Sequence, residues 1–286
     1  MRMKTMYDEI NARLQTLVQN CQEASLQEAM LYSVGAGGKR LRAMLLLSAC
    51  EAVKGSYDET ALDFACALEL IHNYSLIHDD LPCMDDDDLR RGKPTNHKVF
   101  GEAMAILAGD ALLNRAFETM ANLCDSPQNI NAMRVIISAS GDNGMIAGQV
   151  QDILNENKKI DSGTLSNIYG KKTGKLFVAA LKAGAWLGGA DLAYVNAIEQ
   201  VGMKLGLAFQ ILDDILEVES TSEILGKSTD SDSRNKKNTY VSVHGLKAAK
   251  VDYQQISAEA LTALNKLSQK TDALCDVVLS VIKRKM

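Results

Sequence analysis

The chain has few prolines and few aromatic residues. Only three of its 286 residues are prolines, and aromatic residues make up 5% of it. A proline inside a helix removes a backbone donor and clashes with the carbonyl four residues earlier, so their scarcity leaves long segments in which helices can run unbroken. A core with few rings must be built from aliphatic side chains and methionine. Both features favour a chain made mostly of helices.

The chain also lacks a basic excess, a long apolar run and a paired cysteine motif. Its formal net charge is -5, which argues against a nucleic-acid partner because binding a phosphate backbone needs clustered positive charge. No apolar run approaches the roughly 18 residues of a membrane span, so we expect no stable membrane insertion. The six cysteines form no Cys-x-x-Cys pair, and the N-terminus is charged where a signal peptide would be apolar. These absences predict a cytoplasmic protein with reduced thiols.

Apolar residues instead recur at helical spacing along almost the whole chain, and no segment alternates as a strand would. We therefore expect an all-α fold, a single domain over residues 1–286 built as a bundle of about ten helices. The expected helices lie near residues 3–22, 25–34, 40–53, 59–80, 101–123, 128–155, 163–187, 191–218, 245–268 and 271–284.

A dense acidic cluster follows the fourth of these helices. Six aspartates, at positions 79, 80 and 85–88, fall within ten residues. Pro82 cannot continue the helix, so Asp79 and Asp80 lie at its C-terminus, where the helix dipole disfavours each anion by about 0.3–1 kcal/mol. A cation would offset this repulsion. Because the cluster offers oxygen ligands and no cysteine or histidine set, it predicts Mg²⁺.

A second acidic motif lies on a later helix. Gln210, Asp213, Asp214 and Glu217 recur at i, i+3, i+4 and i+7, so they form one polar stripe on a mostly apolar helix. Such a stripe faces either solvent or a polar cavity, and the stripe alone does not decide between them.

The helix before the first cluster carries a similar stripe. His72, Ser75 and Asp79 recur at i, i+3 and i+7. A single histidine among apolar residues is most often a hydrogen-bonded core residue, but its alignment with Asp79 favours a site.

Positive charge gathers at two places. Gly37 and Gly38 precede Lys39, Arg40 and Arg42 at the start of a strongly apolar helix. Free backbone N–H groups and three cations would meet there, which suits a diphosphate, although the spacing is not that of a P-loop. Arg90 and Arg91 directly follow the acidic run, where they either balance its charge or bind a diphosphate that the metals also bind.

The ordered set of motifs resembles that of the trans-isoprenyl diphosphate synthases, the polyprenyl synthetases, and most closely the short-chain bacterial farnesyl diphosphate synthases. The resemblance spans nearly the whole chain and implies that the bundle of about ten helices surrounds a central cavity. It rests on Gly37–Arg42, the two acidic motifs, Gly148-Gln149-x-x-Asp152, Lys172-Thr173-Gly174 and Phe209-Gln210-x-x-Asp213-Asp214.

The resemblance implies a role for each matching residue. Asp79, Asp85 and Asp213 would hold Mg²⁺, three ions in all, together with the allylic diphosphate. Further ligands of the allylic diphosphate would be Arg90, Lys172 and Lys227, and those of isopentenyl diphosphate would be Lys39, Arg42, His72 and Arg91. Lys172, Thr173 and Gln210 would act in catalysis, with the oxygens of Thr173 and Gln210 directed at the allylic cation. A homodimer with small-molecule diphosphate substrates is also implied.

The implied activity is the head-to-tail condensation of isopentenyl diphosphate with dimethylallyl and then geranyl diphosphate, which gives farnesyl diphosphate (C15). Tyr74 lies five residues before Asp79, about 7.5 Å along the helix, where its ring would help to stop the growing chain. A helix places Tyr74 about 140° around from Asp79 and Ser75 only about 40°. Tyr74 would then reach the tunnel from the side.

Other functions remain open at this point. The same reaction would give geranylgeranyl diphosphate (C20) if the tunnel were deeper, and a non-catalytic helical subunit or scaffold is the alternative of another class. A terpene cyclase would carry a different second metal motif, and a di-iron bundle would need paired Glu-x-x-His motifs, which the four histidines do not form. Glu217 and Val241 depart from the residues usual in the family, aspartate and proline.

Overall fold

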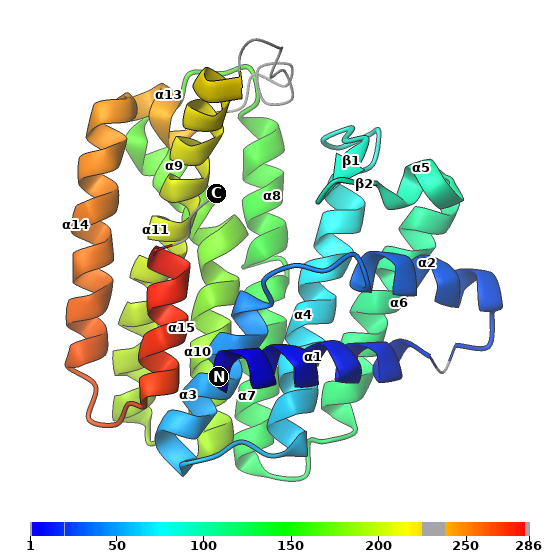
Figure 1. The fold of residues 1–286 in the computed structure, drawn as a ribbon, viewed down its shortest axis with the longest axis vertical. Helices are drawn as coiled ribbons and strands as arrows, with labels where there is room; N and C mark the ends of the chain where they lie inside the picture. The colour runs from blue at the N-terminus through cyan, green and yellow to red at the C-terminus, as the bar shows by residue number, and fades with distance from the viewer. Residues whose placement is uncertain (1, 20, 225–237, 284–286) are drawn as a thin grey trace.

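The structure is a computed structural model that describes residues 2–19, 21–224 and 238–283. In chain order its elements are α1 (Arg2–Val18), α2 (Ala24–Val34), α3 (Leu41–Lys54), α4 (Glu59–Asp79), β1 (Leu89–Arg90), β2 (Lys93–Pro94), α5 (Asn96–Phe100), α6 (Glu102–Ala121), α7 (Pro127–Ser140), α8 (Met145–Leu154), α9 (Ser162–Tyr169), the π-helical turn η1 (Gly170–Gly174), α10 (Lys175–Gly188), α11 (Leu192–Ile224), α13 (Tyr240–His244), α14 (Leu246–Asn265) and α15 (Asp272–Ile282). The all-α fold is thereby confirmed (Figure 1).

Helix α4 runs through the middle of the molecule (Figure 1). Its sequence is apolar on every side, as expected of a helix surrounded by protein, and it packs against α3 and α6. The side chain of Asp58 caps its first turn by accepting a hydrogen bond from the Ala61 amide at 3.0 Å. The helix ends at Asp79, so its buried body holds the first acidic cluster at one end of the bundle.

Helices α3 and α10 approach each other closely. A Cβ atom added at Gly184 would lie 2.1 Å from the carbonyl oxygen of Leu46, so only glycine fits at this crossing. Helix α10 also packs against α7 and α11. Close packing of these helices leaves the backbones little freedom to move apart.

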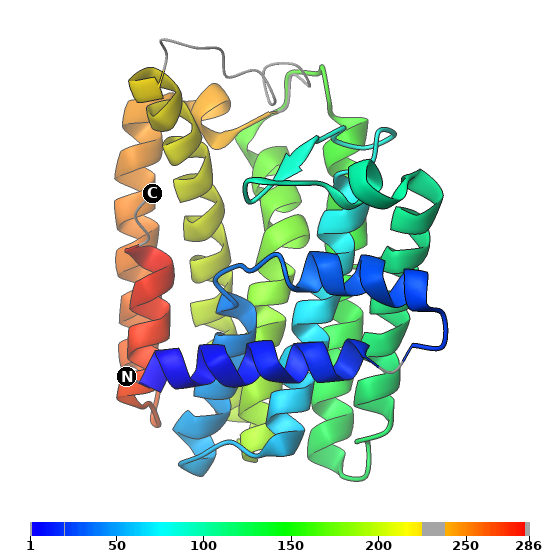
Figure 2. The same cartoon turned by 45° about the vertical axis from the view of Figure 1, so that its right-hand side comes forward.

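Helix α1 runs across the other helices (Figure 2). Four side chains of α1, spaced four residues apart, are fully buried: Met6, Ile10, Leu14 and Val18. This spacing places all four on one face, which explains why α1 lies flat on the bundle. None of the described helices combines the length and the apolar character needed to cross a bilayer.

The structure departs from the expected elements at four places, one of which is the short helix α13 before the expected helix over 245–268. The expected helix over 128–155 is two helices, because the chain turns between Ser140 and Met145 through two glycines. The expected helix over 163–187 contains the π-helical turn η1. The expected loop over 82–99 contains α5 and an antiparallel hairpin that pairs Leu89 with Pro94; strands of two residues are too short to show alternation.

Candidate active site

A cavity of about 910 Å³ opens at the end of the bundle where α4 stops. Its walls come from α3, α4, α6, α8, α9, η1, α10 and α11, from the loop after α4 and from residues 238–239. Both charged residues and apolar side chains line it, the apolar ones including Leu113, Met145, Ile146, Val150, Leu176 and Phe209. A ligand with an anionic head and a hydrocarbon tail matches this combination.

Three aspartates from separate segments line the same cavity. The loop after α4 folds back on itself, since the Asp85 amide donates a hydrogen bond to the Asp79 carbonyl at 2.8 Å. Asp79 and Asp85 therefore both line the cavity, and Asp213 reaches it from α11. Carboxylate oxygens from two directions fit a hard divalent cation such as Mg²⁺, which prefers oxygen ligands.

Two other aspartates of the first cluster contact an arginine of the hairpin. Asp80 is buried and accepts a hydrogen bond from Arg90 Nε at 2.9 Å, while Arg90 Nη2 contacts Asp87 at 3.2 Å. Burial raises the pKa of Asp80, and the Arg90 guanidinium opposes this shift. Arg90 lines the cavity as expected of a diphosphate ligand, but it also neutralises part of the acidic loop.

A second group of charges on the cavity wall is cationic. Arg42 lies over the ring of Phe177, with its guanidinium carbon 4.8 Å from the ring centroid, and burial lowers its pKa to about 10. Burial followed by Arg40 lowers the pKa of Arg91. Burial, Arg42 and Arg91 also hold the pKa of His72 well below its ordinary value. Burial is the largest cause of each shift and repulsion between the cations adds to it, and a bound anion would offset both.

Among the described residues, Arg42 Nε has no hydrogen-bond partner although it is buried. A buried donor without a partner is costly, by about 1–3 kcal/mol. A diphosphate oxygen would satisfy it.

Sequence reasoning missed the role of Arg40. Its side chain is fully buried, where it forms an ion pair with Glu69 (3.5 Å) and donates to Asn11 Oδ1 at 3.0 Å. Its φ of 49° lies in the left-handed region, so the side chain anchors a strained turn directly before Arg42. The available signal was an acidic residue, Glu69, in an apolar helix. Lys39, by contrast, is exposed and is not part of the cavity wall.

The π-helical turn η1 brings Lys172 and Thr173 to the cavity. Lys172 Nζ lies 2.7 Å from Asp152 of α8, and Thr173 Oγ1 donates to Gln210 Oε1 at 2.9 Å. A Cβ atom at Gly148 would lie 2.2 Å from the Lys172 amide nitrogen, so α8 approaches the turn as closely as glycine permits. π-Helical turns occur often at functional sites because they displace side chains from the regular helical positions.

Asp214 has a different environment from Asp213. It is 5% exposed and accepts hydrogen bonds from the Tyr169 hydroxyl (2.5 Å), the Tyr240 amide (2.6 Å) and Gln210 Nε2 (3.2 Å). Burial and Asp214 raise the pKa of Tyr169, so its hydroxyl stays a donor. Asp214 therefore fixes Gln210 and joins α9, α11 and α13. Tyr169 and Tyr240 lie too far away in sequence for this network to be foreseen.

The remaining predicted residues also have defined places. Tyr74 lines the cavity, is 6% exposed and packs edge to face on His78, with ring centroids 5.7 Å apart. Ser75 lines the cavity too and donates to the His72 carbonyl at 2.9 Å. Glu217 is exposed. Lys227 lies outside the described residues.

The chain matches known proteins along most of its length. A farnesyl diphosphate synthase of Geobacillus stearothermophilus is 49% identical over 231 residues, which cover 79% of this chain and 77% of that protein. A chloroplastic geranylgeranyl pyrophosphate synthase of Capsicum annuum is 46% identical over 82% of this chain and 64% of its own length.

A solved structure matches as well. The geranyltransferase of Helicobacter pylori, complexed with magnesium and isoprenyl diphosphate, superimposes with a TM-score of 0.82 at 32% identity, covering 98% of this chain and 96% of that one. The family model described as polyprenyl synthetase matches residues 23–278. A match of this extent, on a fold and a cavity of the kind described, shows that the chain belongs to the polyprenyl synthetase family.

Proposed function

We propose that the protein is a Mg²⁺-dependent prenyltransferase that condenses isopentenyl diphosphate head to tail with dimethylallyl and then geranyl diphosphate, giving farnesyl diphosphate and diphosphate. One observation carries this proposal: a single cavity combines two charged groups of residues with an apolar wall. The carboxylates, which would hold Mg²⁺, and Lys172 suit one diphosphate. Arg42, Arg91 and His72 suit the other. A scaffold protein would not need a cavity that combines these charged groups with an apolar wall.

The reaction separates charge, and the proposed residues suit that separation. The C–O bond of the allylic substrate breaks and its electron pair leaves with the diphosphate. Asp79, Asp85 and Asp213 would hold Mg²⁺, and we propose that three ions bind. These ions would stabilise the departing charge. Lys172 would add a positive charge beside it, and Lys227 is proposed as a further ligand by family resemblance alone.

The carbon end of the substrate needs a different environment. The apolar wall excludes water, which would otherwise add to the allylic cation. The hydroxyl of Thr173 donates to Gln210 Oε1, so both side chains are held in place, and their oxygen lone pairs would stabilise the cation. The double bond of isopentenyl diphosphate, held by Arg42, Arg91 and His72, then forms the new C–C bond, and loss of a proton completes the product.

The C15 product is better supported than C20. The most similar relative described above is a farnesyl diphosphate synthase, and Tyr74 places a large ring on the cavity wall. Geranylgeranyl diphosphate is the second candidate, because a relative at 46% identity carries that name.

A homodimer is also proposed. Apolar side chains are exposed on two neighbouring helices: Ile106 and Leu107 on α6, of which Leu107 is 54% exposed, and Ile137 on α7. Exposed apolar side chains on neighbouring helices would favour association with another protein surface. Light scattering should give twice the mass of 31.1 kDa, and a Leu107→Glu variant should shift the mass toward the monomer. A monomeric parent protein would contradict the proposal.

An assay of the purified protein tests the activity. It measures incorporation of labelled isopentenyl diphosphate with dimethylallyl diphosphate as acceptor, with and without a chelator, and sizes the dephosphorylated product by chromatography. We expect Mg²⁺-dependent formation of farnesol. Incorporation that ends mainly at C20 would support the second candidate, and no incorporation with any allylic acceptor would support the scaffold.

A further inference from the structure

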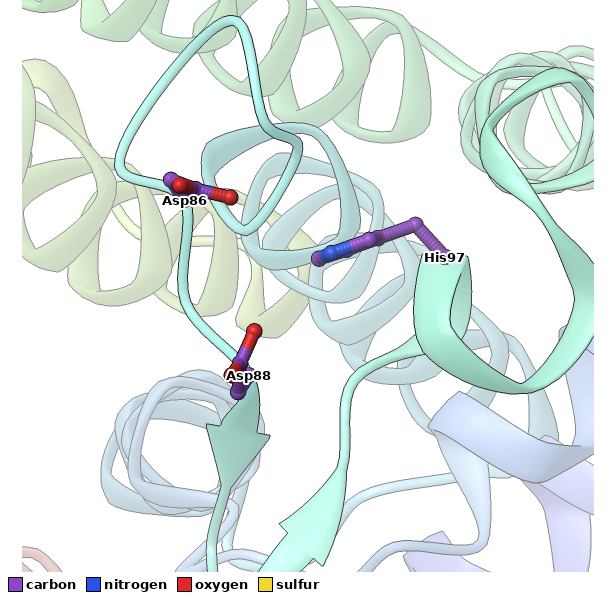
Figure 3. Close-up of side chains that lie close together, drawn as sticks. All are labelled: Asp86, Asp88 and His97. Carbon is purple, nitrogen blue, oxygen red and sulfur yellow. The ribbon is translucent and has the colours of Figure 1, made fainter.

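The four consecutive aspartates of the first cluster face two different regions. Asp85 and Asp87 line the catalytic cavity, whereas Asp86 and Asp88 do not. Asp86 and Asp88 instead lie beside His97, the second residue of α5 (Figure 3). The outer side of this loop thus has an acidic group of its own.

The three side chains are close enough to share one ligand. One atom from each, a carboxylate oxygen of Asp86, a carboxylate oxygen of Asp88 and a ring nitrogen of His97, lies within 4.8 Å of the other two. Figure 3 shows the imidazole pointing toward the space between the two carboxylates. The carboxylates are exposed, but His97 is 93% buried, being 7% exposed. A buried imidazole thus points toward an exposed pair of carboxylates.

The hydrogen bonds around Thr95 determine which ring nitrogen carries the proton. Thr95 Oγ1 donates to the Asp87 carbonyl at 2.7 Å, so its own proton is used. The same oxygen lies 3.2 Å from His97 Nδ1, and that contact is a hydrogen bond only if Nδ1 carries the proton. In the neutral imidazole, His97 Nε2 then carries a lone pair.

In that tautomer, Nε2 and the carboxylates of Asp86 and Asp88 are all electron-pair donors. Within the described part of the chain, the buried His97 Nε2 atom has no hydrogen-bond partner. A buried polar atom without a partner costs about 1–3 kcal/mol. A cation would satisfy the nitrogen and offset the repulsion between the carboxylates.

We propose that Asp86, Asp88 and His97 bind a divalent first-row transition cation of the Zn²⁺ or Mn²⁺ type, on the outer side of the loop that carries Asp85. An imidazole combined with carboxylates favours these ions over Mg²⁺ and Ca²⁺, which prefer oxygen ligands alone. Thr95 acts as the residue that orients the histidine ligand, as hydrogen-bond acceptors do at other metal sites. This site is separate from the catalytic aspartates, and a cation there would hold the loop between Asp85 and β1.

Lys98 is the natural competitor for this cation. Its Nζ atom lies 2.7 Å from Asp88 Oδ1, and both side chains are largely exposed. A metal ion and an ammonium group cannot both neutralise one carboxylate without repelling each other. Removing the Lys98 charge should therefore tighten metal binding.

The test uses the full chain labelled with ¹⁵N at its four histidines. Excess Mg²⁺ is present to occupy oxygen-only sites, and Zn²⁺ is titrated while the ring nitrogens are followed by NMR and the affinity by calorimetry. We expect His97 to show the Nδ1–H form before the titration. Its Nε2 signal should shift as the first equivalent of Zn²⁺ binds.

Variants assign the site. Asp86→Asn and Asp88→Asn, both exposed and expected to fold, should each weaken Zn²⁺ binding about tenfold or more. Lys98→Met should strengthen it, and Asp142→Asn, an exposed acidic control in the turn before α8, should leave it unchanged. The proposal is overturned if His97 Nε2 carries a proton at neutral pH, if another histidine binds the first equivalent, or if the affinity survives the Asp86→Asn/Asp88→Asn double substitution.

Discussion

Neighbouring aspartates in the two acidic motifs have different roles. Asp79 lines the cavity while Asp80 is buried against Arg90. Asp213 and Asp214 both line the cavity, but Asp214 accepts three hydrogen bonds that hold Gln210 and two tyrosines. On the proposed function, each pair of adjacent carboxylates would supply one residue to the bound metal and one that holds neighbouring side chains in place.

At the binding site assigned to isopentenyl diphosphate, Arg42 and Lys39 provide a matched comparison. Arg42 lines the cavity with a buried Nε, whereas Lys39 is exposed and off the wall. We expect Arg42→Gln to raise the KM for isopentenyl diphosphate by about tenfold or more, because a charge-assisted hydrogen bond contributes about 1.5–3 kcal/mol. Lys39→Gln should change it less. Steady-state kinetics with each substrate varied in turn would check this. An equal rise in KM for the allylic substrate would contradict the assignment of the two diphosphate-binding sites.

His72 should show abnormal titration. Burial, Arg42 and Arg91 hold its pKa well below the ordinary 6.5, so the folded state binds fewer protons there than the unfolded chain does. The sign follows: protonating His72 costs stability as the pH falls below 6.5. We expect a neutral imidazole at pH 7 in the free protein, and a rise in its pKa when isopentenyl diphosphate brings negative charge. NMR titration with a His72→Asn variant for assignment measures both values; an ordinary pKa in the free protein would refute the argument.

At the scale of elements, the contact between α8 and η1 positions Lys172. A Cβ atom at Gly148 would meet the Lys172 backbone at 2.2 Å, whereas one at Gly163 on α9 would only touch Asp161 at 3.4 Å. Gly148→Ala should therefore cost about 1–3 kcal/mol of unfolding free energy through overpacking, and it should lower kcat as Lys172 and Thr173 move. Gly163→Ala should be neutral or stabilising by up to about 1 kcal/mol. Denaturant unfolding and turnover of the two variants give the comparison; equal behaviour would mean that the turn tolerates displacement.

Helix α4 is expected to set product length through Tyr74. Tyr74→Ala removes a ring from the cavity wall, so product should shift from C15 toward C20 while the first condensation keeps its rate. Tyr57→Ala, in the loop before α4 and away from the cavity, is the control and should leave the product unchanged. Chromatography of the dephosphorylated products measures the shift. If the Tyr74 variant still stops at C15, another residue closes the tunnel.

At the scale of the whole molecule, helical periodicity was enough to predict an all-α bundle, while the central cavity was expected from the family resemblance. It could not place the break between Ser140 and Met145, because the turning glycines lie between segments that share one apolar pattern. Nor could it detect η1, whose sequence is compatible with a regular helix. The single domain over residues 1–286 and the cytoplasmic location remain predictions.

The candidate site was predictable where residues share one helix or one motif. His72, Ser75 and Asp79 follow from spacing on α4, and all three line the cavity. The links between distant segments were not predictable: Arg40 with Glu69, and Asp214 with Tyr169 and Tyr240, depend on how helices pack. Such long-range contacts leave no periodic signal in a single sequence.

The most direct test of the account compares carboxylates that line the cavity with one that does not. Asp79→Asn, Asp213→Asn and the exposed control Asp142→Asn are assayed with dimethylallyl and isopentenyl diphosphates across a range of Mg²⁺ concentrations. A metal ion contributes several kcal/mol to transition-state stabilisation, so losing one of its ligands should reduce kcat by about 100-fold or more. The account predicts this loss in the first two variants with native unfolding curves, and parental activity in the control. Near-parental turnover in Asp79→Asn or Asp213→Asn, or full activity after complete chelation, would contradict it.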